Sequence, residues 1–325
     1  MTDKPIRVAV LDDYQGVALR LADWSRLPPE IEVTVFRDTL ADEDAVARRL
    51  EPFAILAVTR ERTPFPRSLL QRLPNLKLIA TSGMRNAAID MKAARELGVA
   101  VCGTATLGYP TAELTWGLII GLCRHIARED RAMHEGGGWQ TTLGVGLQGK
   151  TLGVLGLGKL GGQVARIGQA FGMNVVAWSR NLTEARCAEL GVRLAASKDE
   201  LLSTADVVTI HLVLGAATRG LIGAAELARM KPTTYLVNTS RGPIVDEAAL
   251  LEVLRARRIA GAALDVYDRE PLPADHPVRK LDNVLLTPHL GYVTEENYRV
   301  FFGETVENIA AFLKGAPIRV LNAAG

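Results

Sequence analysis

Residues 151–161 read TLGVLGLGKLG, and this stretch decides the fold that the chain is expected to adopt. The run Thr151–Leu155 has the apolar character of a short buried strand, and glycines at 156, 158 and 161 follow it in the spacing G-x-G-x-x-G. Gly156 would allow a tight turn, and Gly158 would let a diphosphate approach the backbone. Gly161 would let the next helix pack closely against the strand.

The residues after the glycines complete this signature. A helix is expected to open at Lys159 and Leu160 and to run to about Gly172, so that its first N–H groups and its dipole face the phosphates. A second apolar strand, Asn174–Trp178, comes next. A glycine turn alone is common and can be purely structural, but a strand before it and a helix and strand after it predict a dinucleotide-binding βαβ unit.

Length and composition bound the class of protein. A chain of 325 residues is long enough for about two domains with separate cores. The net charge of +2 argues against nucleic acid or an anionic membrane as the main partner. The N-terminus shows no signal-peptide pattern, and the most apolar run, Leu114–Cys123, is too short to span a bilayer. We therefore expect a cytoplasmic protein.

The cysteines fit this expectation. Cys102, Cys123 and Cys187 are scattered over apolar segments and match reduced thiols in the cytosol. No His, Cys or Asp cluster has metal-ligand spacing, so no metal site is predicted. Trp116 and Trp139 are expected in the core, and His276, in a proline-flanked loop, is expected to be exposed.

Strand-like and helix-like segments alternate along both halves of the chain, which predicts two parallel sheets with helices on both faces. The expected strands are Ile6–Leu11, Ile31–Phe36, Ala54–Val58, Leu76–Ala80, Val99–Cys102, Thr151–Leu155, Asn174–Trp178, Val207–Leu212, Thr234–Asn238, Ala260–Asp265 and Val284–Leu286. The expected helices include Gly16–Trp24, a long and widely apolar one from Pro110 or Thr111 to about His134, and a last one over Glu295–Leu313.

Three polar side chains follow strands of the second half. Arg241, Glu270 and His289 stand at or after the carboxyl ends of separate strands, where ligands bind in open α/β sheets. Arginine offers a planar fork for a carboxylate, histidine a proton donor near neutral pH, and glutamate a group that can hold the histidine. This set suits reduction of a 2-keto acid by a nicotinamide cofactor. The structural alternative is an ion network without chemistry.

The chain resembles the D-isomer-specific 2-hydroxyacid dehydrogenases, a family that includes D-lactate dehydrogenases, glyoxylate/hydroxypyruvate reductases and 3-phosphoglycerate dehydrogenases. The resemblance covers almost the whole chain. It rests on five motifs: GKTLGVLGLG at 149–158, MKP at 230–232, NTSRGP at 238–243, ALDV at 263–266 with Glu270-Pro271, and TPH at 287–289.

This resemblance implies an α/β architecture of two doubly wound parallel-sheet domains. A Rossmann cofactor domain, residues 104–290, would be inserted into a flavodoxin-like substrate domain made of residues 1–103 and 291–325. The two crossings, near 103 and 290, would form a hinge over the active-site cleft. The resemblance also implies a homodimer through the cofactor domains, which agrees with the apolar 110–134 helix.

The resemblance further implies roles for individual residues. Arg241 would bind the substrate carboxylate and carbonyl oxygen, and His289 would be the acid in keto-acid reduction. Glu270 would hydrogen-bond His289 and favour its charged form. Additional positions in the same motifs would contact the ligands: Asp265 and Thr239 the cofactor, and the backbone around Ser82, Gly83 and Met84 the substrate carboxylate.

Two departures from the family pattern bear on specificity. After the second cofactor-domain strand, NAD-specific members carry an acidic residue, but this chain has Ser179 and Arg180, which could bind a 2′-phosphate. We therefore expect NADP(H) rather than NAD(H), although Arg180 could be a solvated loop charge. Arg85 stands where the family often has glycine, and it either favours a further anionic or polar substrate group or simply points to solvent or to the other domain. His211 ends a strand near the expected adenosine and is either a cofactor contact or structural.

The leading functional hypothesis is hydride transfer between NAD(P)H and a small 2-keto acid or D-2-hydroxy acid such as glyoxylate or hydroxypyruvate. Two alternatives remain open: a dehydrogenase of another small anion, as with phosphite or formate, and a non-catalytic NAD(H)-sensing protein like the dehydrogenase-related corepressors. Turnover on a panel of keto acids distinguishes the three.

Overall fold

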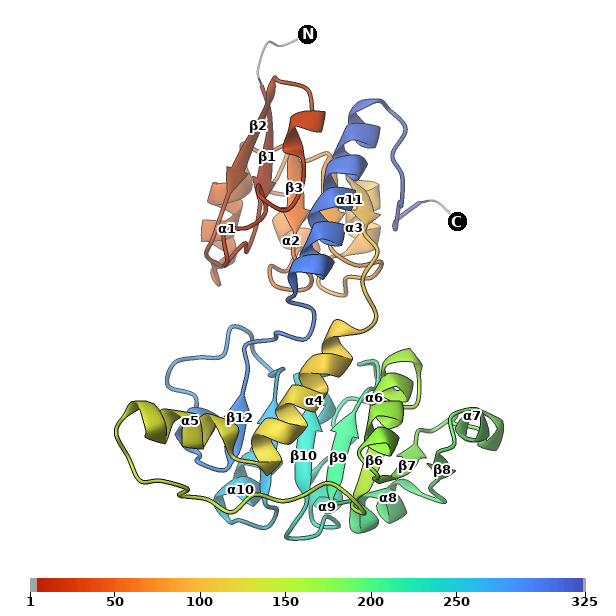
Figure 1. Ribbon diagram of the computed structural model, residues 1–325. Coiled ribbons are helices and arrows are strands. Elements are labelled where there is room, and N and C mark those ends of the chain that lie inside the picture. Colours follow the sequence, from red (N-terminus) through yellow and green to blue (C-terminus); the bar gives the residue numbers. More distant parts are fainter. Residues whose placement is uncertain (1–4, 324–325) are drawn as a thin grey trace. The chain divides into compact units, whose positions relative to one another are not determined.

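Continuous apolar runs form the strands of two parallel sheets, because strands covered by helices on both faces must be buried throughout. The computed structural model describes residues 5–323 (Figure 1). The chain divides into two units: the first holds residues up to Leu107 and from Val293 onwards, and the second holds Gly108–Tyr292. The boundaries expected from the sequence were 103/104 and 290/291.

The first unit has a five-stranded parallel sheet in the order β2-β1-β3-β4-β5, the order of flavodoxin-like folds. Its strands are β1 (Ile6–Val10), β2 (Ile31–Val35), β3 (Ile55–Val58), β4 (Leu78–Thr81) and β5 (Ala100–Gly103). Its helices are η1 (Trp24–Arg26), α1 (Glu43–Leu50), α2 (Arg67–Leu70), α3 (Met91–Glu96) and α11 (Glu295–Leu313). The last of these belongs to the end of the chain, yet it lies with the elements of the first unit (Figure 1). Its Val306 and Ile309 share a core with residues of β1, β3 and β4.

The second unit has a seven-stranded parallel sheet in the order β12-β11-β10-β9-β6-β7-β8. Its strands are β6 (Thr151–Leu155), β7 (Asn174–Trp178), β8 (Arg193–Leu194), β9 (Val207–Ile210), β10 (Tyr235–Asn238), β11 (Gly261–Leu264) and β12 (Val284–Leu286). Counted within the unit, this is the Rossmann order with one strand added at an edge. The strand order reverses beside β6, which pairs with both β7 and β9.

Helices cover both faces of this second sheet. They are α4 (Pro110–Cys123), α5 (Ile126–His134), α6 (Lys159–Ala170), α7 (Glu184–Glu189), α8 (Lys198–Thr204), α9 (Ala224–Leu227) and α10 (Glu247–Arg255), with the short η2 (Gly242–Ile244) and η3 (Pro277–Lys280). The two ends of the unit meet, because the hydroxyl of Thr111 donates to the carbonyl of Gly291 at 2.8 Å.

Polar residues begin several helices by accepting a bond from an N–H of the first turn. Asp42 caps α1, Asp90 caps α3, Asp246 caps α10 and Thr294 caps α11.

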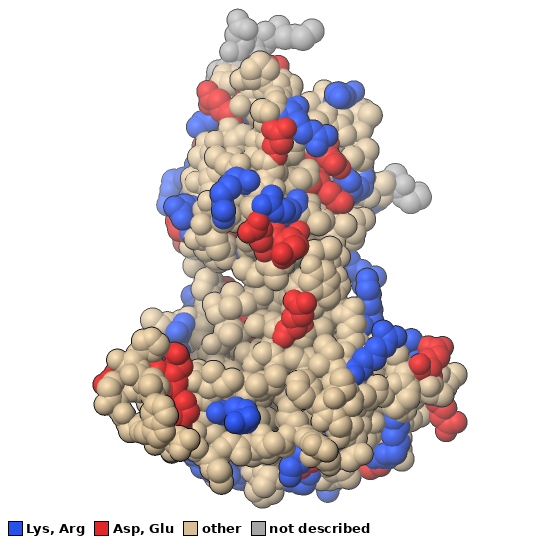
Figure 2. Space-filling view, in the orientation of Figure 1, with Lys and Arg blue, Asp and Glu red and all other residues tan. Residues whose placement is uncertain are grey.

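On the face shown in Figure 2, acidic and basic side chains occur in small mixed groups. Within residues 5–323, no helix combines the length and apolar character needed to cross a bilayer.

The long helix expected over 110–134 is wrong, because two helices stand there. His125 adopts a left-handed conformation (φ 54°) between α4 and α5. The carbonyl of Cys123, which a continuing helix would use internally, accepts the N–H of Val145 at 2.8 Å instead. Nine residues of α4 are buried but none of α5, so the apolar width belongs to α4 alone.

The helix expected over Gly16–Trp24 is also wrong, since this segment is a series of turns leading into η1. The carboxylate of Asp13 accepts the N–H groups of Val17 and Ala18 at 3.0 and 2.9 Å, as at a helix start. The indole of Trp24 then donates to the carbonyl of Ala18 at 2.9 Å, taking the acceptor that a longer helix would need.

Trp116 is buried as expected, but Trp139 is 77% exposed and not in the core.

Candidate functional site

The glycine turn lies at the point where the strand order of the second sheet reverses. Gly156 has φ +97°, and a Cβ there would lie 2.6 Å from the carbonyl oxygen of His211. A Cβ on Gly161 would lie 2.0 Å from the carbonyl oxygen of Gly156. At Gly158, by contrast, no atom of the described residues other than its chain neighbours and the adjoining helix backbone lies within 4 Å of the position of a Cβ. The first and third glycines are therefore required by the protein itself, while the second borders open space that a diphosphate can enter.

These contacts predict opposite results for two alanine variants. Gly158→Ala should fold with nearly wild-type stability but lose NAD(P)H affinity by about tenfold or more, because its methyl occupies space left open beside the helix start. Gly161→Ala should lose both affinity and stability, because the turn must move to admit the methyl. Fluorescence titration with NAD(P)H and urea unfolding measure the two quantities. Wild-type cofactor affinity in Gly158→Ala would contradict this assignment.

His211 stands beside this turn at the end of β9. Its Nε2 lies 2.9 Å from the hydroxyl of Thr209, and its buried Nδ1 has no hydrogen-bond partner among residues 5–323. Burial lowers the pKa of His211 to about 3, so the ring is neutral near pH 7. A buried, unpartnered nitrogen at the strand end fits a site that a ligand completes.

The lowered pKa of His211 predicts an acid-dependent loss of stability. The unfolded chain takes up a proton at His211 below about pH 6.5, whereas the folded chain does not until near the lowered value. Stability is therefore complete above about pH 6.5 and falls as the pH drops towards 3. Between pH 7 and 5 the wild type should lose about 2 kcal/mol more than His211→Gln. Urea unfolding at both pH values measures this difference, and equal losses would refute it.

Arg241, Glu270 and His289 all belong to the second unit. The ring Nδ1 of His289 and Oε2 of Glu270 are 2.6 Å apart, and the other carboxylate oxygen accepts the N–H of Tyr267 at 2.9 Å. A carboxylate can only accept, so Nδ1 carries the proton that this pair shares. The two side chains are 20% and 32% exposed, which leaves the pair reachable from solvent.

Arg241 is placed by the turn after β10. The amide of Asn238 accepts the N–H of Ser240 and donates to the carbonyl of Arg241, both at 3.0 Å. The next residue, Gly242, lies against the loop of Glu270, because a Cβ there would be 2.1 Å from the carbonyl carbon of Tyr267. The segment that carries the arginine and the segment that carries the glutamate are thus in direct backbone contact.

Asp265 holds the loop that carries His289. Its Oδ1 accepts the hydroxyl of Thr287 at 2.6 Å and the N–H of Leu290 at 2.7 Å, and its Oδ2 accepts the N–H of Gly291 at 2.9 Å. His289 itself has φ +54°. Burial raises the pKa of Asp265, and the bonds from this loop oppose that rise. The sequence pointed to Asp265 only as a cofactor contact, because its loop partners are set by tertiary structure.

The remaining expected cofactor contacts also lie at strand ends of the second sheet. The hydroxyl of Thr239 is buried and lies 2.8 Å from that of Thr115 in α4, a pairing that no motif indicated. Ser179 and Arg180 follow β7 directly, and Arg180 is exposed. Because Gly156 donates its N–H to the carbonyl of Trp178 at 2.9 Å, this strand end adjoins the glycine turn. Lys159 and Leu160 open α6 as expected.

In the first unit, the expected substrate loop follows β4. Ser82 is buried and accepts the N–H of Arg60 through its hydroxyl at 2.8 Å. The N–H of Ser82 donates to Val58 at 3.0 Å, and that of Gly83 (φ +88°) donates to the hydroxyl of Thr104 at 2.9 Å. Met84 and Arg85 are exposed. Two of the three N–H groups expected to receive a carboxylate are therefore already bonded within the unit.

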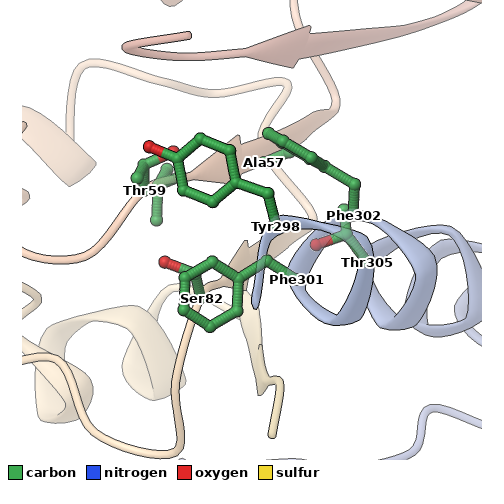
Figure 3. A pocket seen from close by; sticks show the side chains of 8 residues that line it. Ala57, Thr59, Ser82, Tyr298, Phe301, Phe302 and Thr305 are labelled. Carbon is green, nitrogen blue, oxygen red and sulfur yellow. The ribbon is translucent and has the colours of Figure 1, made fainter. Parts of the chain in front are cut away.

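A small cavity lies behind this loop, within the first unit. Thr59 and Ser82, at the ends of β3 and β4, form one wall, and Tyr298, Phe301, Phe302 and Thr305 of α11 form the other (Figure 3). The aromatic side chains of α11 thus support the strand ends from which the loop emerges.

Among the described residues, no group of three or more His, Cys, Asp or Glu side chains could hold a metal ion.

Comparisons with known proteins agree with this geometry. Residues 116–291 match the model of the D-isomer specific 2-hydroxyacid dehydrogenase, NAD binding domain. The chain is 41% identical over 256 residues to a glyoxylate reductase of Aeropyrum pernix, covering 76% of each chain. It is 30% identical over 333 residues to a hydroxypyruvate reductase of Blautia hydrogenotrophica, covering 98% of this chain and 100% of that one.

A solved structure gives the same result for the fold. The crystal structure of a phosphoglycerate oxidoreductase from Vibrio cholerae superposes with a TM-score of 0.91 at 40% identity, covering 96% of this chain and 100% of that one. An open Rossmann sheet with a glycine turn at its switch point is the architecture of a dinucleotide-binding protein. More narrowly, the chain belongs to the D-isomer-specific 2-hydroxyacid dehydrogenases, a family of NAD(P)-dependent enzymes.

Proposed function

We propose that this enzyme reduces a small 2-keto acid, such as glyoxylate or hydroxypyruvate, to the D-2-hydroxy acid, with NADPH as the preferred cofactor. The contact of 2.6 Å between His289 and Glu270 carries the proposal, because it fixes a protonated Nδ1 and leaves Nε2 for acid–base work. Relatives named glyoxylate reductase and hydroxypyruvate reductase support the substrate class.

In this proposal the chain binds and orients the keto acid and provides a proton. The guanidinium of Arg241 holds the carboxylate and polarises the carbonyl oxygen. Nε2 of His289 donates a proton to that oxygen, and Glu270 stabilises the imidazolium before the transfer and orients the ring. Asp265 keeps the loop of His289 in place and, with Thr239, borders the nicotinamide. The nicotinamide, when bound, supplies the hydride.

The backbone of the first unit receives the substrate carboxylate in this proposal. Since the N–H groups of Ser82 and Gly83 already have acceptors, the carboxylate would be bound from Met84 onwards. Arg85, exposed in the same loop, would contact a second anionic or polar group of a larger substrate. Residues up to 103 and from 291 onwards would then make up the substrate domain, and 104–290 the cofactor domain.

Steady-state kinetics on glyoxylate, hydroxypyruvate and pyruvate, each with NADPH and NADH, test the proposal. We expect turnover with at least one keto acid. Cofactor binding without turnover on any of them would support a sensing protein instead. Turnover confined to formate or phosphite would point to a dehydrogenase of another small anion.

The cofactor preference depends on Ser179 and Arg180, which replace the carboxylate that binds a ribose 2′-hydroxyl. Arg180→Ala should lower kcat/KM for NADPH by about tenfold while changing that for NADH little, because only the former carries the 2′-phosphate. The ratio of kcat/KM for NADPH to that for NADH, measured in wild type and variant, gives the result. A wild-type ratio well below one would end the assignment of NADPH.

We further propose a cytoplasmic homodimer formed through the cofactor domain. Support comes from apolar side chains exposed on α5 and the following loop: Ile126 at 51%, Met133 at 56%, Trp139 at 77% and Leu143 at 93%. The three cysteines are free and buried, as is usual for proteins of a reducing compartment. Light scattering on a sizing column tests the dimer, and a mass of one chain at micromolar concentration would refute it.

A further inference from the structure

The segment that follows Glu270 holds its own shape. The carbonyl of Pro273 accepts the N–H of His276 at 3.1 Å and Nε of Arg279 at 2.8 Å. The carbonyl of Leu272 accepts Nη2 of Arg279 at 2.8 Å. A displacement of this segment would therefore also move Glu270, which directly precedes it.

A small cavity lies between this segment and α10. Val245, Leu250 and Leu251 form its apolar side, and Glu247, Asp268 and His276 are among the polar residues that line it. Val278 and Leu272 of the segment pack on the same core as Leu250 and Leu251. A polar contact at the edge of the cavity acts in addition to this packing.

The contact at this edge is a second histidine–carboxylate pair. Nε2 of His276 lies 3.1 Å from Oε1 of Glu247, the first residue of α10, and Nδ1 accepts the N–H of Val278 at 3.3 Å. An accepting Nδ1 leaves the proton on Nε2, which donates to the carboxylate. The side chain of His276 is only 15% exposed, so its expected exposure is wrong. The carboxyl of Asp268 lines the same cavity and is acted on by the charges of Glu247, Arg219, Asp246 and His276.

We propose that His276 is a positioning residue for the reaction: by tying the loop to α10, it keeps the carboxylate of Glu270 against His289. The path is short and continuous. His276 anchors residues 271–279, and Glu270 opens that segment. Glu270 also accepts the N–H of Tyr267, whose carbonyl carbon adjoins Gly242. This inference rests on the proposed function, in which His289 is the acid.

The test compares His276→Leu, His276→Gln and Glu247→Ala with the wild type. His276→Leu and Glu247→Ala should lower kcat by about tenfold and leave cofactor affinity unchanged. The alkaline limb of the pH profile should move to lower pH, because a displaced Glu270 favours the charged imidazolium less. His276→Gln, whose amide can still donate to Glu247, should recover most of kcat. The downfield proton resonance of the His289–Glu270 bond should weaken in the first two variants.

Lys198→Met is the matched control, because it breaks a similarly covered ion pair of the same unit, Lys198–Glu226 at 2.7 Å, far along the chain from Glu270. It should lose comparable stability in urea but keep the wild-type kcat and pH profile. A wild-type kcat and pH profile in both His276→Leu and Glu247→Ala, or an equal slowing in Lys198→Met, would overturn the inference. The resonance is observed without turnover, so it separates a failure here from a failure of the proposed reaction.

Discussion

His289→Ala should lower kcat for keto-acid reduction by about 10²–10⁴-fold, the usual contribution of a general acid, while leaving NADPH affinity nearly intact. The reason is local. The ring makes its polar contact with Glu270 at 2.6 Å, and its loop is held by Asp265 through residues 287, 290 and 291 rather than through the imidazole. Removing the ring therefore takes away the proton donor without releasing the loop.

Single-turnover rates with bound NADPH measure this effect, and fluorescence titration gives the affinity. Glu270→Gln serves as a graded control, because an amide can still accept from Nδ1 but carries no charge to stabilise an imidazolium. The kcat of Glu270→Gln should fall less than that of His289→Ala. As the pH rises, its activity should begin to decline at a lower pH than that of the wild type. A His289→Ala enzyme within about threefold of the wild-type kcat would remove His289 from the chemistry.

Arg241→Lys should lower kcat/KM for the keto acid by about 10²-fold. An ammonium keeps the positive charge but cannot form the two parallel bonds of a guanidinium, each charge-assisted bond contributing about 1.5–3 kcal/mol. The guanidinium of Arg241 donates to the carbonyl of Ser240 at 2.8 Å, but the turn also depends on Asn238 and on the close approach of Gly242 to Tyr267, neither of which involves the arginine side chain. The backbone should thus survive the change.

The substitution should weaken use of the keto acid and leave cofactor binding unchanged. KM for the keto acid should therefore rise, while the dissociation constant of NADPH stays the same. Arg229→Lys, at an exposed ion pair with Asp199, controls for the exchange of the two cations elsewhere in the unit. Retention of the wild-type kcat/KM by Arg241→Lys would show that the fork does not hold the substrate.

The fold was predictable where burial on both faces leaves a continuous apolar run, as in Leu152–Leu155 and Val207–Ile210. The fold was not predictable where a hydrogen bond from outside a segment takes a backbone carbonyl that a local helix would use. The bond from Val145 to Cys123 ends α4, and the indole of Trp24 takes the carbonyl that a helix after Gly16 would use. The edge strand β8 was also missed, because its two residues are too few to show a period.

The candidate site shows the same division. Strand ends and motifs could place Arg241, Glu270 and His289 on one sheet, and the family resemblance implied the bond between the last two. Neither indicated the backbone contact at Gly242. The glycine spacing, in contrast, carried its geometry with it, because each glycine answers a distinct steric demand. His276 was taken for an exposed loop residue because its partner Glu247 lies 29 positions away in the chain.

The bond between Thr111 and Gly291 has a practical consequence for engineering. A segment whose two ends are joined by a hydrogen bond can be expressed from a single gene fragment without long unstructured termini. Residues 108–292 should consequently serve as a portable nucleotide-binding module, to be produced separately or spliced into another host between two neighbouring loop positions.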